Sequence, residues 1–404
     1  MLPYAHLDAD SFFASVIVRS HPQYEGKPLL ALGMGGGCVI AATYEAKAQG
    51  VKTGMRLSEA RSLVPGAIEA CADFGETLEA SREIEAIIRD HGAIVEQMSI
   101  DEWFIDLRSC VGGSPVNEQK WAEDIQEEIY KKTHLWMSVG VAETITLAKM
   151  ASEKKKPRGI TVVKMNNREI FLKNRPIGAI PGIGRARLPR VQEYGWKTAW
   201  DFVQGNDVRR HEICGRVGEE LRQELSGESI YKISNRIEPP QSISRCRSFQ
   251  RTRSKDLVKA HILKHLEYCT MKMRREGLSC KEISIWIRDG EYQHRGRHWK
   301  LETTSETVEA MLPSITKAID ELIRRTDICT QAGLALLKLT SASMLQPSLF
   351  EDRTKGVHDL NIQKAMDALH ERFGRDSITR GSALAVRSGV KRRVWTMETE
   401  GKSL

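Results

Sequence analysis

Two consecutive prolines, Pro239 and Pro240, interrupt the chain and limit what it can fold into. Proline has a fixed φ and no backbone N–H, so a tandem pair continues neither a helix nor an inner strand. Residues 238–241 are therefore interpreted as a linker between separately folded parts. The 404 residues exceed what one hydrophobic core ordinarily serves. We expect roughly two to four domains.

The part before the prolines mixes strand and helix patterns. Short runs typical of strands occur at 4–7, within 96–107 and at 136–141. Helical spacing of apolar residues occurs at 11–20, 75–91 and 117–132. Residues 166–238 look all-helical, and 180–184 forms a sharp turn. The helix after that turn is expected to carry Arg185, Arg187 and Arg190.

The part after the prolines predicts a sheet covered by helices. The pattern reads as a strand from 242, a helix at 255–275, two strands, a helix at 305–326 and a strand at 331–340. Ile283, Ile285 and Ile287 alternate with more polar neighbours, which is the period of a strand with one buried face. Beyond Ser343 the periodicity ends, and we expect a polar tail.

Positive charge is concentrated in this second part. Lys plus Arg number 61 against 53 Asp plus Glu, for a net charge of +8. Residues 241–340 alone hold 19 basic and 12 acidic side chains. Such a module suits a polyanion such as nucleic acid. A solvated, lysine-rich surface is the alternative.

The remaining composition predicts a cytoplasmic protein that does not enter a membrane. The chain has no apolar run of the roughly 18 residues that a membrane helix needs, and its N-terminus becomes acidic before a secretory signal could form. No two cysteines have the Cys-x-x-Cys spacing of a zinc or redox site, so reduced core thiols are expected. The cysteines are at positions 38, 71, 110, 214, 246, 269, 280 and 329.

Carboxylates stand at the ends of the expected strands. Asp8 and Asp10 close the first strand, and Asp101 and Glu102 form an acidic turn between two later strands. Phosphoryl transfer assisted by two divalent cations needs several carboxylate oxygens at one point. The pattern fits that chemistry, although an acidic turn is more often a solvated surface feature.

The contexts of these carboxylates resemble the two palm motifs of Y-family DNA polymerases. The motifs are Asp8-Ala-Asp-Ser-Phe-Phe-Ala-Ser-Val and Ser-Ile-Asp101-Glu102-Trp-Phe-Ile-Asp-Leu. The resemblance implies a low-fidelity, template-directed DNA polymerase for translesion synthesis, a nucleotidyltransferase of DNA repair. It implies Asp8, Asp101 and Glu102 as catalytic residues that bind two Mg²⁺ ions, with Mn²⁺ as an alternative, and the Ala9 carbonyl as a further ligand. Asp10 and Asp106 are assigned structural support.

The same resemblance implies a multidomain α+β fold shaped like a right hand. Its expected parts are a palm at 1–20 and 76–165, fingers at 21–75, a helical thumb with a helix-hairpin-helix turn at 166–238, a βαββαβ little finger at 242–343 and a C-terminal tail at 344–404.

Four residues are expected to contact the nucleotide. Tyr44 and Lys47 resemble the Tyr-Glu-Ala-Arg element of the fingers, with lysine in place of arginine, which keeps the charge but loses the planar fork. Lys156, in a Lys-Lys-Lys-Pro-Arg-Gly run, resembles a second phosphate-binding lysine. Phe13 falls at the steric-gate position, where a ring fills the space of a ribose 2′-hydroxyl. Core packing is the alternative role for Phe13, and a surface turn is the alternative for Lys156.

DNA contacts are expected in two places. Gly182 and Gly184 resemble a helix-hairpin-helix turn, whose backbone amides approach a phosphate. The first little-finger strand is expected to hold the duplex backbone with arginines that point mainly to one face. These are Arg245, Arg247, Arg251 and Arg253.

A short motif in the tail predicts attachment to a sliding clamp. Gln346-Pro-Ser-Leu349-Phe350 resembles the pentapeptide by which bacterial polymerases dock on that ring. Five-residue patterns arise by chance, so the position of the motif after the last strand supports the interpretation as much as its residues do.

Further runs resemble UmuC, the catalytic subunit of bacterial DNA polymerase V, and this branch of the family is preferred. They lie at 37–41, 144–149, 346–352 and 366–374. Ile145 replaces a lysine usual there, and Tyr44 and residues 156–159 are closer to the single-subunit DNA polymerase IV group. The UmuC resemblance implies a role in the SOS response and SOS mutagenesis. It also implies a processed UmuD-type dimer and a RecA filament as partners, besides primer-template DNA, dNTP and the clamp.

Two other classes of protein remain possible on the sequence. One is a catalytically inactive polymerase homologue that binds the clamp as a DNA-repair scaffold, although this chain keeps all three metal carboxylates. The other is a helix-hairpin-helix DNA-binding protein without enzymatic activity, which would leave the paired carboxylates, Phe13 and Tyr44 unexplained.

Overall fold

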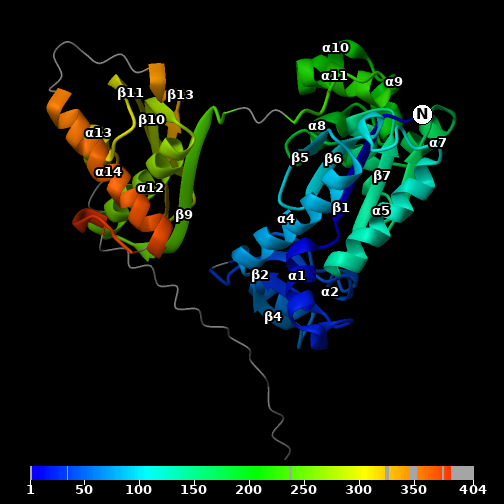
Figure 1. The fold of residues 1–404 in the computed structure, drawn as a ribbon, viewed down its shortest axis with the longest axis horizontal. Helices are drawn as coiled ribbons and strands as arrows, with labels where there is room; N and C mark the ends of the chain where they lie inside the picture. The colour runs from blue at the N-terminus through cyan, green and yellow to red at the C-terminus, as the bar shows by residue number, and fades with distance from the viewer. Residues whose placement is uncertain are drawn as a thin grey trace, which may run out of the picture. The chain divides into compact units, whose positions relative to one another are not determined.

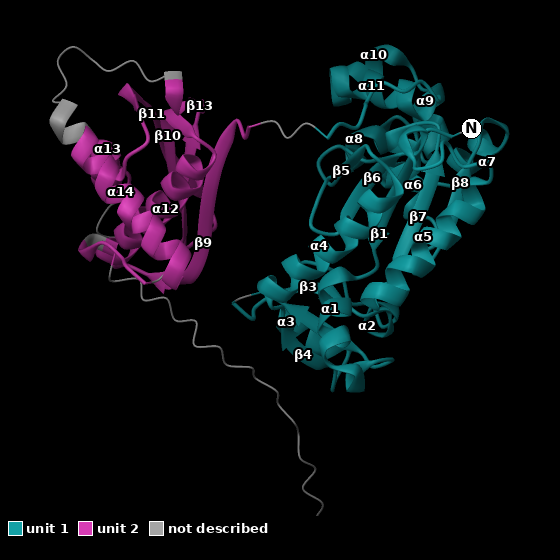
Figure 2. Ribbon diagram, viewed as in Figure 1, with its two compact units in different colours: residues 1–237, 393–404 teal, residues 238–392 magenta. Residues whose placement is uncertain are grey.

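The protein is represented by a computed structural model that describes residues 2–33, 35–235, 239–323, 327–344, 353–374 and 377–383. The chain divides into two compact units, drawn from residues 1–237 and 238–392 (Figure 2). Within the described residues, no helix combines the length and apolar character needed to cross a membrane.

A five-stranded sheet forms the centre of the first unit, with β1 in its middle (Figure 1). The sheet order is β5-β6-β1-β7-β8. Its strands are β1 (Tyr4–Ala9), β5 (Val95–Gln97), β6 (Glu102–Asp106), β7 (Met137–Ala142) and β8 (Ile160–Val163). β1 is antiparallel to both β6 and β7, and β7 is parallel to β8. The strands predicted at 4–7, 96–107 and 136–141 are confirmed.

Alternating side chains give this sheet two different faces. Leu7, Trp103 and Val139 are fully buried in one cluster with residues of α4 (Phe74–His91) and α5 (Glu118–Thr133). Burial of each such side chain stabilises the fold by roughly 1.5–3 kcal/mol. The opposite face packs against α6 (Ile145–Ser152). The intervening strand residues therefore point to the α6 side.

Capping residues explain where these three helices begin. The side chains of Asp73, Asn117 and Thr144 accept hydrogen bonds from backbone N–H groups in the first turns of α4, α5 and α6. Such caps satisfy donors that the helix cannot satisfy itself. The helices predicted at 75–91 and 117–132 are confirmed within a residue or two.

A smaller sheet follows α1 (Phe12–Ser20) in the chain. It has the order β3-β2-β4 and consists of β2 (Leu29–Leu32), β3 (Val39–Ala42) and β4 (Ile68–Cys71). α1 packs against β2 and β3, and two short helices lie between β3 and β4 in the sequence. These are α2 (Tyr44–Ala48) and α3 (Leu57–Leu63).

The first unit ends in a helical segment, as predicted for this region. The helices are α7 (Met165–Lys173), α8 (Leu188–Glu193), α9 (Ala199–Gln204), α10 (Asp207–Cys214) and α11 (Arg216–Leu225). One expectation was wrong: Arg185 and Arg187 precede α8, and only Arg190 lies on it. Proline fits best in the first turn of a helix, and Pro189 occupies that turn, so α8 begins only at Leu188.

The second unit has the predicted βαββαβ order. Its elements are β9 (Ser242–Thr252), α12 (Lys255–Arg275), β10 (Leu278–Asp289), β11 (His294–Ser305), α13 (Val308–Leu322) and β12 (Cys329–Leu337). The sheet is antiparallel with the order β11-β10-β12-β9, and β13 (Thr340–Ser341) pairs with β10. Ile283, Ile285 and Ile287 are fully buried against α12 and α13, as their alternation predicts.

Two predicted boundaries in this unit need correction. The second helix was expected from 305, but Ser305 still belongs to β11, and the Thr307 hydroxyl caps α13. The segment beyond Ser343 was expected to be a polar tail in which the periodicity ends, yet α14 (Arg353–Phe373) forms there. α14 docks through polar contacts: the Arg274 guanidinium donates to both oxygens of Asp367 at 2.8 and 2.9 Å, and Gln363 donates to Glu309. An apolar periodicity does not reveal a helix held in this way.

Candidate active site

Two carboxylates face each other at the centre of the first sheet. The register pairs Asp8 of β1 with Glu102 of β6 on one side and with Ser138 of β7 on the other. Directly opposed residues of antiparallel strands have Cβ atoms about 4.5–5.5 Å apart, and like charges in such a pair destabilise a sheet. Asp8 is also only 5% exposed. A structural role does not explain two acidic residues here.

Helix α6 brings two cations and a third carboxylate to this face. Gly140 of β7 allows the close approach, because a Cβ there would lie 2.1 Å from the Ala148 carbonyl oxygen. Lys149 forms a salt bridge with Glu102. Lys156, just beyond the helix, places its Nζ 2.5 Å from Asp8 Oδ1 and 2.6 Å from Glu153 Oε1.

These groups form a site suited to divalent cations. Asp8, Glu102 and Glu153 each offer one oxygen, and the three oxygens lie within 4.8 Å of one another. Carboxylate oxygens are the ligands that Mg²⁺ and Mn²⁺ prefer. Burial raises the pKa of Asp8 well above its ordinary value, although Lys156 acts in the opposite direction. A bound cation would favour the ionised carboxylate, so the residues present fit such an ion.

Asp101 lies beside this group but is not part of it. Its carboxylate accepts a hydrogen bond from Ser99 Oγ at 2.6 Å, and its backbone oxygen accepts one from the Ala9 N–H at 2.9 Å. Asp101 and Ala9 are thus adjacent at the end of β1. The structure brings together two of the three expected catalytic carboxylates and adds Glu153 to them.

Asp10 supports the loops around the site. Its carboxylate accepts hydrogen bonds from Ser138 Oγ at 2.8 Å, the Arg158 N–H at 2.7 Å and the Tyr44 hydroxyl at 3.2 Å. The carboxylate of Asp106 instead accepts two hydrogen bonds from the Arg108 guanidinium, at 2.8 and 2.7 Å. The carboxylates of Asp10 and Asp106 therefore both accept hydrogen bonds from other residues of the first unit.

Tyr44 and Lys47 of α2 lie close to the carboxylates. The Lys47 Nζ donates to Ser11 Oγ at 2.7 Å and lies 4.5 Å from the centre of the Tyr44 ring. Burial lowers the pKa of Lys47, and the charge of Lys156 lowers it further. Lys47 and Lys156 are both partly buried and repel each other, so an anion bound between them would stabilise both ammonium groups.

Phe13 projects from the first turn of α1 and is half-buried. Its ring meets Phe74 edge-on, with 5.5 Å between the ring centres. It also packs against the buried cluster shared by α1 and the smaller sheet, whereas its neighbour Phe12 belongs to the core of the larger sheet. Phe13 thus has both a packed side and an exposed side.

The residues expected to contact DNA lie on separate units. Gly182 has a φ of +91°, a conformation that favours glycine, and its carbonyl accepts a hydrogen bond from Arg187. A Cβ on Gly184 would meet nothing within 4 Å. Both glycines lie in the turn before α8.

The arginines of the second unit lie on or next to the edge strand β9. Arg245 and Arg247 are two and four positions after the buried Ile243, and side chains at such spacing lie on the same face of a strand. They therefore lie on the side covered by α12. There the Arg245 guanidinium is 4.2 Å from the centre of the Tyr268 ring. Arg251 donates to the Gly290 carbonyl. Arg253 was expected on the strand but follows it, because the next residue, Ser254, caps α12.

The residues expected to bind a clamp, Gln346, Leu349 and Phe350, lie outside the described residues. Among the residues that the structure places beside the carboxylates, Lys149 and Glu153 were missed by sequence reasoning. They are four positions apart at the end of a helix, and that spacing places both on one face. The spacing alone would have been a weak signal.

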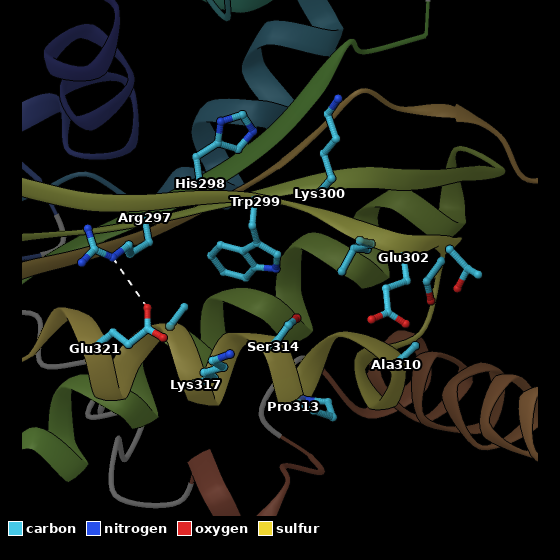
Figure 3. Close-up of a pocket in the computed structure, with 14 residues that line it drawn as sticks. Arg297, His298, Trp299, Lys300, Glu302, Ala310, Pro313, Ser314, Lys317 and Glu321 are labelled. Carbon is cyan, nitrogen blue, oxygen red and sulfur yellow. Dashed lines mark ion pairs between the residues drawn. The ribbon is translucent and has the colours of Figure 1, made fainter.

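A cavity of about 780 Å³ lies in the second unit, between β11 and α13 (Figure 3). Trp299 points from β11 toward α13, whereas His298 and Lys300 point away from it. The salt bridge between Arg297 and Glu321, at 3.9 Å, joins the two elements. None of the expected site residues lines this cavity, so its size does not mark the reactive centre.

Comparisons with known proteins relate the chain to one family along most of its length. Residues 7–153 match the impB/mucB/samB family, and residues 240–349 match the C-terminal domain of that family. A DNA polymerase IV of Methanoculleus marisnigri is 32% identical over 306 residues, which cover 72% of this chain and 82% of the relative. A DNA polymerase IV of Caulobacter vibrioides is 27% identical over 388 residues, or 95% and 94% of the two chains. Protein ImpB of Salmonella typhimurium is 26% identical over 384 residues, or 91% and 90%.

Solved structures show the same similarity. A Y-family DNA polymerase chimera of Dbh and Dpo4 has a TM-score of 0.73 and 26% identity, covering 84% of this chain and 99% of the chimera. An insertion ternary complex of Dbh DNA polymerase has a TM-score of 0.58 and 25% identity, and it also covers 84% of this chain and 99% of the solved chain. The fold described above is therefore similar to that of these polymerases.

Proposed function

Since the chain belongs to the Y family of DNA polymerases, and is thus a DNA-directed DNA polymerase of the translesion type, we propose that it extends a primer 3′ end with low fidelity by two-metal phosphoryl transfer. The observation that carries the mechanism is the Asp8–Glu102 pair at the centre of the sheet, flanked by Lys149 and Lys156.

The carboxylates are proposed to hold two Mg²⁺ or Mn²⁺ ions. Asp8, Asp101 and Glu102 are the ligands, with the Ala9 carbonyl completing one site. When bound, the ions supply positive charge to the attacking 3′-hydroxyl and to the triphosphate. The backbone of Asp101 is hydrogen-bonded to Ala9, the neighbour of Asp8, and its side chain is proposed to turn from Ser99 toward the ions.

Residues around the carboxylates are proposed to bind the incoming nucleotide. Lys47 and Lys156 provide two cations for the triphosphate, and both are partly buried, where electrostatic attraction is stronger than in water. The Tyr44 hydroxyl donates a hydrogen bond to Asp10, and Tyr44 is proposed to border the triphosphate site. Phe13 is the proposed steric gate for the sugar.

We propose that the observed sheets and helices correspond to the expected parts of a right-hand polymerase. The larger sheet with α4, α5 and α6 serves as the palm, the smaller sheet as the fingers and α7–α11 as the thumb. The second unit serves as the little finger, with β9 as a cationic edge strand for the duplex backbone. Gly182 and Gly184 are proposed to approach a DNA phosphate.

We also propose the UmuC-like branch, with a UmuD-type dimer, a RecA filament and the sliding clamp as partners in SOS mutagenesis. The support is the set of UmuC-like runs in the sequence, and relatives named DNA polymerase IV and protein ImpB both span nearly the whole chain. If the purified chain alone extends primers as well as it does with the dimer and filament added, the branch assignment is wrong.

Primer extension tests the proposed activity. We expect the purified chain to extend a labelled primer with dNTPs and Mg²⁺, to continue past an abasic site in the template and to stop when EDTA is added. The reaction is run without and with a UmuD-type dimer and RecA filament. Absence of extension under both conditions, with Mg²⁺ and with Mn²⁺, would contradict the proposal.

Phe13→Ala is expected to reduce discrimination against ribonucleotides. Forcing an extra atom into filled space costs about 1–3 kcal/mol, so opening that space should raise rNTP relative to dNTP incorporation roughly 5- to 150-fold. The measurement is kcat/KM for a matched rNTP and dNTP. Phe13→Tyr, which keeps the ring, is the control and should retain discrimination. An unchanged ratio in the alanine variant would mean that Phe13 only packs.

A further inference from the structure

The ammonium of Lys156 occupies the position of a cation between two carboxylates. Its Nζ lies 2.5 Å from Asp8 Oδ1 and 2.6 Å from Glu153 Oε1. The Lys156 side chain is 22% exposed, that of Asp8 is 7% exposed and that of Glu153 is 44% exposed. Lys156 therefore bridges a buried carboxylate and a more exposed one, and both belong to the group of three carboxylates described above.

A filled site would set these two acceptors apart. Asp8 is a proposed metal ligand, and a divalent cation bound to it would repel the Lys156 ammonium, because both charges are positive. The contact between Lys156 and Asp8 is therefore expected to weaken. Glu153 is not one of the proposed ligands and is the more exposed acceptor, so it would remain the partner of Lys156.

The position of Glu153 is fixed by the packing of α6. Glu153 follows the last residue of the helix, and its backbone N–H donates to the helix carbonyls of Ala151 and Lys149. The preceding residue, Ser152, is buried and hydrogen-bonded to the fully buried His6 of β1 at 2.7 Å. The backbone of Glu153 is thus held beside the sheet that carries Asp8, and its carboxylate contacts Lys156 from that fixed point.

We propose that Glu153 is a positioning residue that retains Lys156 when Asp8 turns to the metal ions and directs its ammonium to the triphosphate. This inference rests on the proposed function of the site. In the absence of nucleotide, the Lys156 ammonium contacts both Asp8 and Glu153. With ions and nucleotide bound, the ammonium lies between Glu153 and the phosphates. Cation entry and triphosphate binding are thereby coupled through one side chain.

Glu153→Gln tests the inference through nucleotide affinity. We expect KM for dNTP to rise about 5- to 30-fold while kcat changes less than about threefold, because the lost interaction acts on binding. The inhibition constant of inorganic tripolyphosphate, competing with dNTP, should rise by the same factor. Glu153→Asp should recover part of the affinity. Glu127→Gln, which removes an equal charge from an exposed ion pair on α5, is the control and should change neither constant.

A double-variant comparison separates positioning from a structural role. If Glu153 acts through Lys156, adding Glu153→Gln to Lys156→Ala should raise KM little beyond the single Lys156→Ala variant. Additive effects would overturn the proposal, and so would a fall in kcat at constant KM, which would make Glu153 a participant in the chemistry. An inactive parent protein would instead contradict the proposed function. Unchanged KM in Glu153→Gln with an active parent would overturn only this inference.

Discussion

Replacing Glu102 with alanine is expected to reduce nucleotide addition by at least about 10³-fold, equivalent to about 4 kcal/mol of transition-state stabilisation. Glu102 faces Asp8 directly across the β1–β6 pair, so its loss removes one proposed ligand from the centre of the site. Asp101→Ala should have an effect of the same order. Primer-template affinity should stay within a few-fold, because the basic regions and not the carboxylates bind the duplex.

Single-turnover incorporation and DNA-binding titrations, measured side by side, check this expectation. Thermal unfolding should show little loss of stability, since removal of Glu102 also removes a repulsion with Asp8, although Lys149 and Ser99 each lose a contact with it. Glu127→Gln is again the charge-matched control. Near-normal extension by either alanine variant would show that the metal site has been assigned to the wrong residues.

Sequence patterns predicted most of the fold because the central strands are short apolar runs and the long helices bury one face each. Tyr4–Ala9 is buried along its whole length, and the helix at 255–275 was found at those residues. The predictions that were wrong involve other forces. Pro189 set the start of α8, and α14 docks through Arg274–Asp367 and related polar contacts.

The site was predictable in part for a similar reason. Asp8 and Glu102 belong to strands, and strand register places them opposite each other. Glu153 and Lys149 reach the same point only because α6 packs directly on β7, and that contact depends on the missing side chain of Gly140. That packing brings α6 against β1, and a contact between residues this far apart in the sequence leaves no local pattern. Lys156 was expected beside the nucleotide only through the resemblance, and the spacing of the Lys-Lys-Lys run did not reveal its contact with Asp8.

The second large effect is expected from Leu349→Ala combined with Phe350→Ala, and it concerns attachment and not chemistry. A few apolar anchors usually supply most of a short peptide's binding energy. Loss of about 2–4 kcal/mol would weaken docking on a sliding clamp roughly 30- to 1,000-fold. The carboxylates belong to the other unit of the chain, so incorporation without clamp should be unchanged.

Product length with and without a loaded clamp measures this difference, alongside thermal unfolding. The double variant should extend a primer at the parent's distributive rate when clamp is absent, but should lose the longer products that the clamp gives the parent. If Leu349 and Phe350 instead pack on the second unit, the variant should unfold at a lower temperature and extend more slowly even without clamp. Equal clamp stimulation of parent and variant would exclude the docking role, because a peptide without its two anchors cannot retain the ring.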